Sequence, residues 1–396
     1  MNFVKLQDVI LSCDSGTWGN DPADGVSASP VLRSSNIHDF KLTLDEFAWR
    51  EIPIMDLERK KLQNGDIIIT ASSGSPDLIG KCAYFSQPNN DFDYYFSNFT
   101  LRLRGNEKVI FPKFLFYWLI SKQARSYLKG ANDTTSGLRN LNKKLYLKQP
   151  IPFPPLPEQK RIAEVLDKAD ALREKRRLAL HKLDALLQSV FLEMFGDPVK
   201  NPKGLTKKTL GELIKVKSGA FLPEKSFNKT GSIPVYGGNG ISGYHNEFMF
   251  DRPMLVIGRV GVYCGAVHLT SAFSWITDNA LYISEKSDEL DETYLFYALK
   301  QAKLNQYAGR FAQPLVSGSR IYPVSIIVPP MDLQNKFALI IEKIKDLEIK
   351  ETKASDKAEN LFQSLQQRAF KGELFSDESL TVKPQEGKVW GQTSLF

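Results

Sequence analysis

The hydrophobic pattern of the chain contains two long stretches that repeat every seven residues. From Ile162 to Met194, core-type positions recur in alternating steps of four and three, and the same steps recur 175 positions later from Phe337 to Ala369. A seven-residue repeat kept over five heptads is typical of a coiled-coil helix. The matched ends, LLQSVFLEMF at 186–195 and LFQSLQQRAF at 361–370, indicate an internal duplication. We therefore predict long helices over 156–195 and 331–375.

Charged residues interrupt both stripes at matched heptad positions, arginines in the first and glutamates in the second. Two interpretations are open: the charges are solvated where the stripe wobbles, or they form a charged layer that fixes the register at a cost in stability. The second interpretation predicts loss of register when Arg176 and Glu351 both become leucine. The predicted seam, which we also expect to take part in subunit docking, comprises Ile162, Leu166, Arg173, Arg176, Leu180, Leu183 and Leu187, and Phe337, Ile341, Ile344, Glu348, Glu351, Phe362 and Leu365.

Outside the helices, short β-branched and aromatic runs broken by Gly, Pro, Asn and Asp predict strands. GDIIITASSG (65–74) has a counterpart in MLVIGRVG (254–261), and SNFTLRLR (97–104) has one in DNALYIS (278–284). FLFYWLISKQARSYL (114–128) and YLFYALKQAKLNQYA (294–308) each predict a single helix. We predict an α+β fold with two β-rich α/β domains, 1–155 and 196–330, and a tail at 376–396. The two long helices should form an antiparallel coiled coil about 58 Å long at ~1.5 Å per residue, with approximate two-fold symmetry.

Composition and charge narrow the class of partner. The 396 residues carry a net charge of +7. The first domain has 19 Lys and Arg against 16 Asp and Glu, the second has 15 against 11, and the helix between them is nearly balanced with 8 against 7. Basic domains on neutral helices favour a polyanionic partner. The chain has no apolar run long enough for a membrane span, no signal-peptide pattern and only three scattered cysteines, so we expect a cytoplasmic protein without membrane partners.

Catalytic and cofactor motifs are missing or defective in the sequence. GSPDLIGK (74–81) has five residues between its glycines where a phosphate-binding loop has four, and Cys82 stands where a magnesium-binding Ser or Thr belongs. The glycine-rich stretch 236–240 lacks dinucleotide-binding spacing and is better interpreted as a turn. The four histidines show no metal-ligand spacing with the cysteines. We expect no catalytic residue, no metal site and no cofactor in this chain.

Basic and amide side chains outside the helices are the candidates for DNA contact. Arginine is the commonest reader of guanine edges, whereas lysine more often neutralises phosphate. Taken alone, each of these residues is more typical of a solvated surface charge than of a DNA contact. Arg102 and Arg104 alternate along a predicted strand, so both should point to one face. The candidates are Arg33, Arg102, Arg104, Arg139, Asn140, Lys143, Lys144, Asn239, Arg259, Arg310 and Arg320.

Two segments resemble the specificity subunits of type I restriction–modification systems. They are PFPPLPEQKRIAEVLDKADALREKRRLALHKLDALLQSVFLEMFGDP (152–198) and IPVYGGNGISGY (233–244), and the resemblance extends over roughly residues 1–375. It implies two target recognition domains that each read one half of a split sequence of double-stranded DNA. Because the two copies have diverged, we expect the half-sites to differ and the target to be asymmetric. It also implies helices that set the half-site spacing and dock two modification (methyltransferase) subunits. The second copy departs from the family's PPLxEQ pattern, with PPMDLQ at 329–334.

The resemblance places the chemistry of the system in partner subunits. S-adenosylmethionine would bind the modification subunits, and ATP and Mg would belong to partners such as the restriction (motor and nuclease) subunits. Two other functions remain as alternatives: a coiled-coil scaffold or adaptor with two protein-binding domains, and a self-sufficient nuclease–methyltransferase. The missing catalytic motifs disfavour the second. If the helices set the spacing, deletion of one heptad from both should change the gap between half-sites and leave each half-sequence unchanged.

Overall fold

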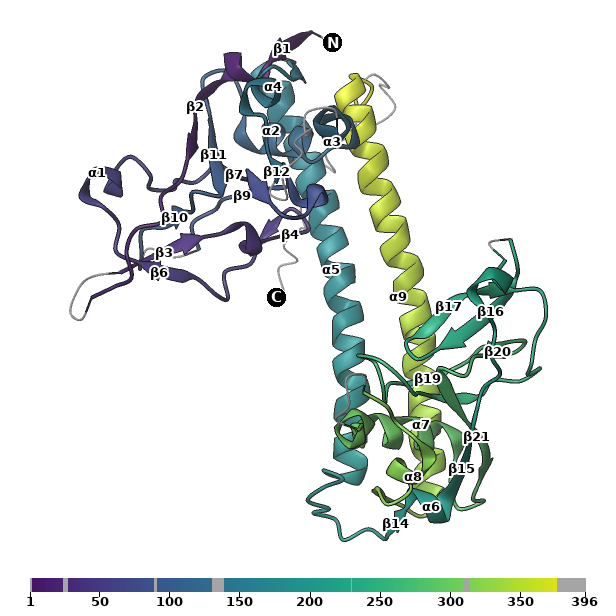
Figure 1. The fold of residues 1–396 in the computed structure, drawn as a ribbon. Helices are drawn as coiled ribbons and strands as arrows, with labels where there is room; N and C mark the ends of the chain where they lie inside the picture. Colours follow the sequence, from purple (N-terminus) through teal and green to yellow (C-terminus); the bar gives the residue numbers. More distant parts are fainter. Residues whose placement is uncertain are drawn as a thin grey trace, which may run out of the picture. The chain divides into compact units, whose positions relative to one another are not determined.

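The chain divides into two compact units, each with a β-rich domain and part of both long helices (Figure 1). The computed structural model describes residues 2–23, 28–88, 91–129, 139–228, 230–309 and 314–375. Unit 1 comprises Met1–Lys175 and Ser355–Phe396, and unit 2 comprises Arg176–Ala354. The long helices are α5 (Leu156–Phe195) and α9 (Met331–Lys371). The predicted tail at 376–396 lies outside the described residues.

Unit 1 is built on a four-stranded antiparallel sheet in the order β2 (Ile10–Ser15), β11 (Thr100–Gly105), β7 (Ile67–Thr70) and β9 (Cys82–Tyr84). A smaller sheet has the order β10 (Tyr95–Phe96), β3 (Ser29–Leu32) and β6 (Ala48–Arg50). Three two-stranded pairs complete the strands: β1 (Phe3–Lys5) with β13 (Pro150–Pro152), β8 (Ser72–Ser73) with β12 (Arg139–Asn140), and β4 (Ile37–His38) with β5 (Lys41–Leu42). The short helices are α1 (Ile54–Leu57), α2 (Pro112–Leu119), α3 (Lys122–Lys129) and α4 (Lys143–Leu147).

Unit 2 repeats this plan. Its four-stranded sheet has the order β15 (Ile214–Ser218), β21 (Ala280–Lys286), β18 (Leu255–Gly258) and β19 (Val267–Leu269), all antiparallel. The smaller sheet has the order β17 (Gly240–His245), β16 (Ile233–Gly237) and β20 (Trp275–Ile276), and β14 (Lys207–Thr209) pairs with β22 (Ser325–Ile327). The short helices are α6 (Leu210–Leu213), α7 (Glu292–Gln301) and α8 (Gly318–Ile321). The α+β fold with two β-rich domains is therefore confirmed.

The prediction of one helix over each of 114–128 and 294–308 was wrong in detail. In unit 1 the helix ends at Leu119, and α3 begins after Ser121, whose hydroxyl accepts a hydrogen bond from the Ala124 N–H at 3.2 Å. In unit 2, α7 ends at Gln301, and Lys303 adopts a left-handed φ of 46° before a short 3-10 turn. The apolar period continues through both breaks, so it could not reveal them.

Within each unit the two long helices pack together with opposite chain direction. In unit 1 the N-terminal part of α5, with Ile162 and Leu166, shares a core with Phe362 and Ala369 of α9. In unit 2 the C-terminal part of α5, with Phe191, shares a core with Phe337 and Ile341 near the start of α9. The antiparallel pairing of the helices is thus confirmed. Every predicted seam residue is shielded: the structure buries Ile162, Leu166, Phe337, Ile341, Ile344 and Phe362, and half-buries Arg173, Arg176, Leu180, Leu183, Leu187, Glu348, Glu351 and Leu365.

The charges that interrupt the stripe meet across the helix pair. Nη1 of Arg176 donates to both carboxylate oxygens of Glu351 at 3.0 Å. In unit 1, Nε of Arg173 lies 2.9 Å from a carboxylate oxygen of Glu359, and its guanidinium stacks 4.2 Å from the centre of the Phe362 ring. The solvated-charge interpretation therefore does not describe Arg176, whose partner sits at the same repeat position of the other helix.

We expect the Arg176–Glu351 pair to specify register more than stability. Both side chains are about one third exposed, and a pair of that kind contributes no more than about 1 kcal/mol. The double variant R176L/E351L should keep its melting temperature within a few degrees, because two leucines restore an apolar seam. Spin labels on the two helices should then report a broadened distance distribution. A distribution as narrow as that of the unaltered chain would show that the charged pair does not fix the register.

A buried glutamine ties the first turn of each long helix to its domain. In unit 1, Gln159 accepts the Phe111 N–H at 2.8 Å and donates to the Val109 and Pro154 carbonyls at 3.1 and 2.9 Å. In unit 2, Gln334 accepts the Asp291 N–H and donates to the Glu289 and Pro329 carbonyls, each at 2.8 Å. Both glutamines are 0% exposed. The glutamine of the PPLxEQ pattern thus has the same structural role in both copies, although Glu158 is replaced by Leu333.

Candidate nucleic-acid interface

One edge of the four-stranded sheet has the same backbone hydrogen bonds in both units, which we call the backbone frame. It is the edge where β7 ends in unit 1 and where β18 ends in unit 2. In unit 1 the Ala71 N–H donates to the Phe99 carbonyl at 2.9 Å, and the Ala71 carbonyl accepts the Leu141 N–H at 2.8 Å. In unit 2 the Arg259 N–H donates to the Asn279 carbonyl at 2.9 Å, and the Arg259 carbonyl accepts the Val316 N–H at 2.8 Å. The backbone of this edge is therefore duplicated, whereas its side chains have diverged.

In unit 2 this edge gathers polar side chains that can read DNA. The guanidinium of Arg259 lies 3.1 Å from the Ser218 hydroxyl and 3.2 Å from the Asp278 carbonyl, which hold it at the end of β18. Asn279 is exposed beside it. These contacts leave part of the arginine fork open, and a fixed arginine next to an asparagine can form hydrogen bonds with base edges in the major groove.

Glycines bring a hairpin turn onto this edge in unit 2. Gly238, in the turn between β16 and β17, lies so close that an added Cβ would be 3.3 Å from the Asn279 carbonyl oxygen. An added Cβ on Gly258 would be 2.3 Å from the Gly238 carbonyl oxygen, so only glycine fits there. The exposed Asn239 follows Gly238 in the same turn. The structure thus brings two predicted residues, Asn239 and Arg259, to one edge.

In unit 1 the same edge carries different chemistry. Phe99, which takes the place of Asn279, is 51% exposed. Ser72 donates a hydrogen bond to the side-chain oxygen of Asn140 at 2.6 Å, across the β8–β12 pair. Lys143 and Lys144 are exposed nearby in α4, and the Lys143 ammonium donates to the Cys13 carbonyl. An exposed aromatic ring suits contact with a thymine methyl or stacking, whereas the amide and ammonium groups suit bases and phosphates.

Three ionisable groups near the unit 1 edge have shifted pKa values. The Lys60 ammonium donates to the Ser15 carbonyl, and burial lowers the pKa of this lysine below its usual value. Burial raises the pKa of the Cys13 thiol to about 11, so it carries no charge near neutral pH. Partial burial would by itself raise the pKa of Asp14, but hydrogen bonds from Arg102 and Ser12 bring it below its usual value.

Two predicted arginines of β11 point into unit 1. Arg102 is 4% exposed; it donates to a carboxylate oxygen of Asp14 at 2.6 Å and to the Lys61 carbonyl at 3.0 Å. Arg104 forms two hydrogen bonds of 2.7 Å with the buried carboxylate of Asp66. Both donate to the Lys61 carbonyl, so they share one face. That face is internal, and we do not include these arginines in the DNA-contact proposal.

The remaining predicted residues are dispersed. Arg33 is half-buried at the end of β3, where its backbone N–H donates to the Asn36 side chain at 2.9 Å. Arg320 is exposed in α8, and its guanidinium lies against Gly309. The Arg139 backbone pairs with Ser73 in β12, next to the unit 1 edge, whereas its side chain lies outside the described residues. Arg310 also lies outside them.

Residue-type arguments missed several members of the two edges, namely Ser72, Phe99, Ser218 and Asn279. Aligned at an offset of 180 positions, the matched segments SNFTLRLR and DNALYIS place Phe99 opposite Asn279. That signal could have identified both as variable positions on a repeated frame.

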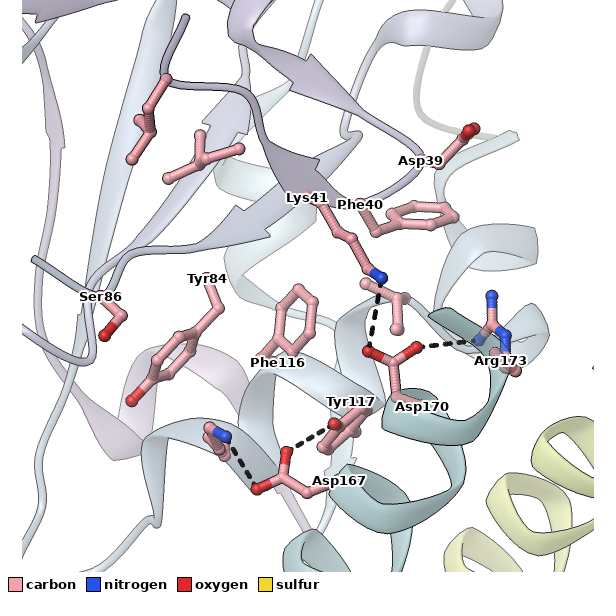
Figure 2. A pocket seen from close by; sticks show the side chains of 14 residues that line it. Asp39, Phe40, Lys41, Tyr84, Ser86, Phe116, Tyr117, Asp167, Asp170 and Arg173 are labelled. Carbon is pink, nitrogen blue, oxygen red and sulfur yellow. Dashed lines mark hydrogen bonds and ion pairs between the residues drawn. The ribbon is translucent and has the colours of Figure 1, made fainter. Parts of the chain in front are cut away.

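A separate hollow of about 290 Å³ lies in unit 1 between the β4–β5 hairpin, α2 and α5 (Figure 2). Asp167 of α5 accepts hydrogen bonds from the Tyr117 hydroxyl at 2.6 Å and the Lys113 ammonium at 2.7 Å. Burial, followed by the hydrogen bond to Asp167, raises the pKa of Tyr117. Lys41 of the hairpin reaches Glu174 at 2.7 Å and Asp170 at 4.0 Å. These paired carboxylates repel phosphate and join the domain to α5, so we assign the hollow a structural role.

Both long helices carry a second apolar row at heptad spacing, whose leucines are exposed and whose alanines and Val165 are half-buried. Leu172 and Leu186 of α5 are 36% and 43% exposed, and Leu347 and Leu361, 175 positions later in α9, are 48% and 46% exposed. The full rows are Val165, Leu172, Ala179 and Leu186, and Ile340, Leu347, Ala354 and Leu361. Residues seven apart lie on nearly one face of a helix. We call these two sets the outer rows.

Comparisons with known proteins agree on one family. The sequence model described as "Type I restriction modification DNA specificity domain" matches residues 29–181 and 202–360. The chain is 29% identical over 253 residues to the type I restriction enzyme EcoprrI specificity subunit of Escherichia coli, an alignment covering 59% of this chain and 61% of that protein. It is 24% identical over 370 residues to the putative type I restriction enzyme MjaX specificity subunit of Methanocaldococcus jannaschii, covering 87% of this chain and 86% of that protein.

Solved structures show the same fold. The type I restriction–modification S subunit from M. genitalium aligns with a TM-score of 0.59 at 15% identity, covering 93% of this chain and 96% of that one. A chain from a study of complex assembly and conformational transition of the type I R-M system aligns with a TM-score of 0.53 at 18% identity, covering 94% of this chain and 98% of that one.

Over the described part of the chain, no helix has the length and apolar character needed to cross a membrane. The described residues likewise contain no group of three or more His, Cys, Asp or Glu placed to hold a metal ion.

Proposed function

Because this chain belongs to the family of type I restriction–modification DNA specificity domains, we propose that each of its β-rich domains reads one half of a split DNA target. Proteins of this family are the non-catalytic specificity subunits of their systems. One observation carries the half-site proposal: the edge at β7 and β18 has one backbone frame with different side chains, Phe99 against Asn279 and Ala71 against Arg259. A repeated frame docks on DNA in one way, and divergent side chains select different bases. The two half-sites should therefore differ.

Affinity and selectivity come from different groups in this proposal. Exposed lysines such as Lys143 and Lys144 neutralise phosphates, and the edge side chains contact bases. Filter binding of double-stranded DNA over a salt series, with the partner subunits present, tests the function. We expect a steep loss of affinity with salt and a large preference for the target over other sequences. Salt-independent binding without sequence preference would instead support a scaffold whose basic charge is incidental.

Arg259 should carry selectivity in the second half-site. The variant R259A should lower affinity for the full target by about ten- to a hundredfold, because one good arginine–base contact contributes ~1–3 kcal/mol of discrimination. Discrimination between targets should be lost only where they differ in the half-sequence that unit 2 reads. The matched control is R252A. It removes an exposed arginine that precedes the start of β18, whereas Arg259 follows the end of this strand. Equal losses in the two variants would show that Arg259 contributes only charge.

The outer rows are the proposed docking surface for two modification subunits. Their positions match residue for residue at an offset of 175, so a partner that fits one row fits the other. The restriction subunits would join through that assembly. S-adenosylmethionine, ATP and Mg would be held by these partner subunits, and this chain would supply only sequence choice and docking.

Substitution in an outer row should block docking without unfolding the chain. Leu186 is 43% exposed, so L186D should change the free energy of unfolding by only about 0.5 kcal/mol. A buried charge at the interface should weaken binding of the modification subunit at least tenfold, measured by sedimentation or calorimetry. The control Q188D places the same charge on an exposed position outside the row. If both variants bind equally well, the row is not the docking surface.

A further inference from the structure

The loop that follows the edge at β7 and β18 is duplicated, but it differs in length between the units. It comprises residues 71–79 in unit 1 and 259–264 in unit 2. A glycine closes each loop, because the N–H of Gly80 or Gly265 donates to the carbonyl of the last strand residue, at 2.9 and 2.7 Å respectively. Both glycines have a positive φ, 70° and 83°, so the chain turns back in the same way. The loop of unit 1 is therefore three residues longer but is closed by the same hydrogen bond.

The last part of each loop also has the same backbone hydrogen bonds. The Ile79 N–H donates to the Pro76 carbonyl at 3.2 Å, and 185 positions later the Cys264 N–H donates to the Gly261 carbonyl at 3.0 Å. In both units the carbonyl of the preceding residue accepts an N–H at 3.1 Å. Ile79 and Cys264 are both buried. The three extra residues of unit 1 therefore lie in the first part of its loop, and the remaining positions correspond one to one.

One exposed position in this matched part carries opposite chemistry in the two units. It holds Asp77 in unit 1 and Val262 in unit 2, again 185 positions apart. Asp77 is exposed, and Val262 is 89% exposed. A carboxylate repels phosphate, and a valine side chain has no group that attracts it. Attraction to the DNA backbone therefore explains neither residue.

In unit 2 the loop packs beside the hairpin turn that carries Asn239. An added Cβ on Gly258 would be 2.3 Å from the Gly238 carbonyl oxygen and 2.7 Å from the Tyr263 carbonyl oxygen. Gly258 is thus in close contact with the turn on one side and with the residue after Val262 on the other. The exposed valine therefore belongs to the same edge as the turn.

In unit 1 two sets of contacts hold the loop through its backbone. Its first part forms β8, which pairs with β12 at the same edge. The Arg125 guanidinium donates to the Asp77 and Ile79 carbonyls at 3.3 and 3.1 Å. These bonds fix the backbone at Asp77, so the exposed carboxylate is presented from a defined place on the edge.

We propose that this loop position selects one base in each half-site: Asp77 accepts a hydrogen bond from a cytosine amino group, and Val262 contacts a thymine methyl group. The inference rests on the proposed function, because it requires that each domain reads one half-site. In the major groove, carboxylates accept from the cytosine amino group and apolar side chains contact the thymine methyl group. Because the two residues occupy equivalent places, the selected bases should lie at corresponding positions of the two half-sites.

Replacement of single thymines by deoxyuridine tests the valine contact. The target is first selected from a random DNA library with the partner subunits present, and each thymine of the half-site that unit 2 reads is then replaced in turn. One replacement should weaken binding of the unaltered protein by about fourfold, because it removes one methyl group from the interface. The same replacement should have less than a twofold effect on V262A, which lacks the methyl groups that meet the thymine.

The variant V199A is the matched control for V262A. Val199 is 83% exposed and follows the end of α5, so V199A removes the same groups from a different place on unit 2. It should keep the fourfold effect of the replacement. The proposal is overturned if every thymine replacement affects V262A and the unaltered protein equally, or if that half-site contains no thymine on either strand.

Exchange of the two residues tests both units. In library selection, D77V should lose its preference for cytosine at one position of the first half-site by at least about fivefold, and V262D should gain one for cytosine in the other half-site. Both positions are exposed, so the melting temperature should stay unchanged. Recovery of the original half-sequences with both variants contradicts this inference alone. If the unaltered protein selects no sequence at all, the proposed function fails as well.

Discussion

Replacement of Gln334 by leucine should be among the most destabilising single changes in this chain. The side chain is 0% exposed and satisfies three backbone groups, the Asp291 N–H and the Glu289 and Pro329 carbonyls. Leucine fills a similar volume but leaves all three without a partner, and each buried unpaired group costs ~1–3 kcal/mol. We expect a loss of at least about 3 kcal/mol in the free energy of unfolding, which lowers the melting temperature by roughly 10 °C.

The duplication supplies matched controls for this prediction. Q159L in unit 1 should have a comparable effect, because Gln159 forms the same three hydrogen bonds. N335A, at the exposed residue next to Gln334, should change stability by no more than about 0.5 kcal/mol. Urea unfolding of the three variants gives the comparison. A loss below about 1 kcal/mol in Q334L would mean that water or a local shift can satisfy the orphaned groups.

The long helices and the duplicated domain plan could be predicted because both rest on periodic burial. An apolar stripe kept over five heptads is buried by packing against a partner helix. In the structure, α5 and α9 shield every predicted seam residue. The glutamine clamps could not be predicted in this way. Gln159 and Gln334 are polar residues in a first helical turn, and their burial depends on carbonyls contributed by other segments of the chain.

Sequence reasoning could not tell which of the candidate arginines face solvent, for a physical reason. Alternation showed that Arg102 and Arg104 share a face, but not that acidic partners on other segments, Asp14 and Asp66, make that face internal. An arginine with a buried carboxylate partner looks the same in sequence as one that faces solvent. Arg259 differs because its neighbours are a hydroxyl and a backbone carbonyl, which orient the guanidinium without neutralising it.

Lengthening both long helices by one heptad should change which DNA target the protein selects. The insertion duplicates residues 180–186 in α5 and 344–350 in α9. Both segments lie between the Arg176–Glu351 ion pair and the Phe191–Phe337 ring contact, so both contacts can re-form. Seven residues add about 10 Å at ~1.5 Å per residue, equivalent to about three base pairs at ~3.4 Å per step. A heptad is within ~20° of two whole helical turns, so each domain keeps nearly the same orientation about the helix axis.

If the helices set the half-site spacing, the original target can no longer engage both domains at once. Loss of simultaneous engagement should lower its affinity by a factor of at least ~100. Selection from a DNA library with variable gaps should recover the same two half-sequences with a gap about three base pairs longer. Three base pairs also turn the duplex by roughly 100°, so the lengthened protein should bind its new target more weakly than the unaltered protein binds the original target.

Deletion of the same segments should shorten the gap. A recovered gap of the original length in the lengthened protein would show that something other than these helices measures the distance, because the half-sequences and the domains that read them are unchanged.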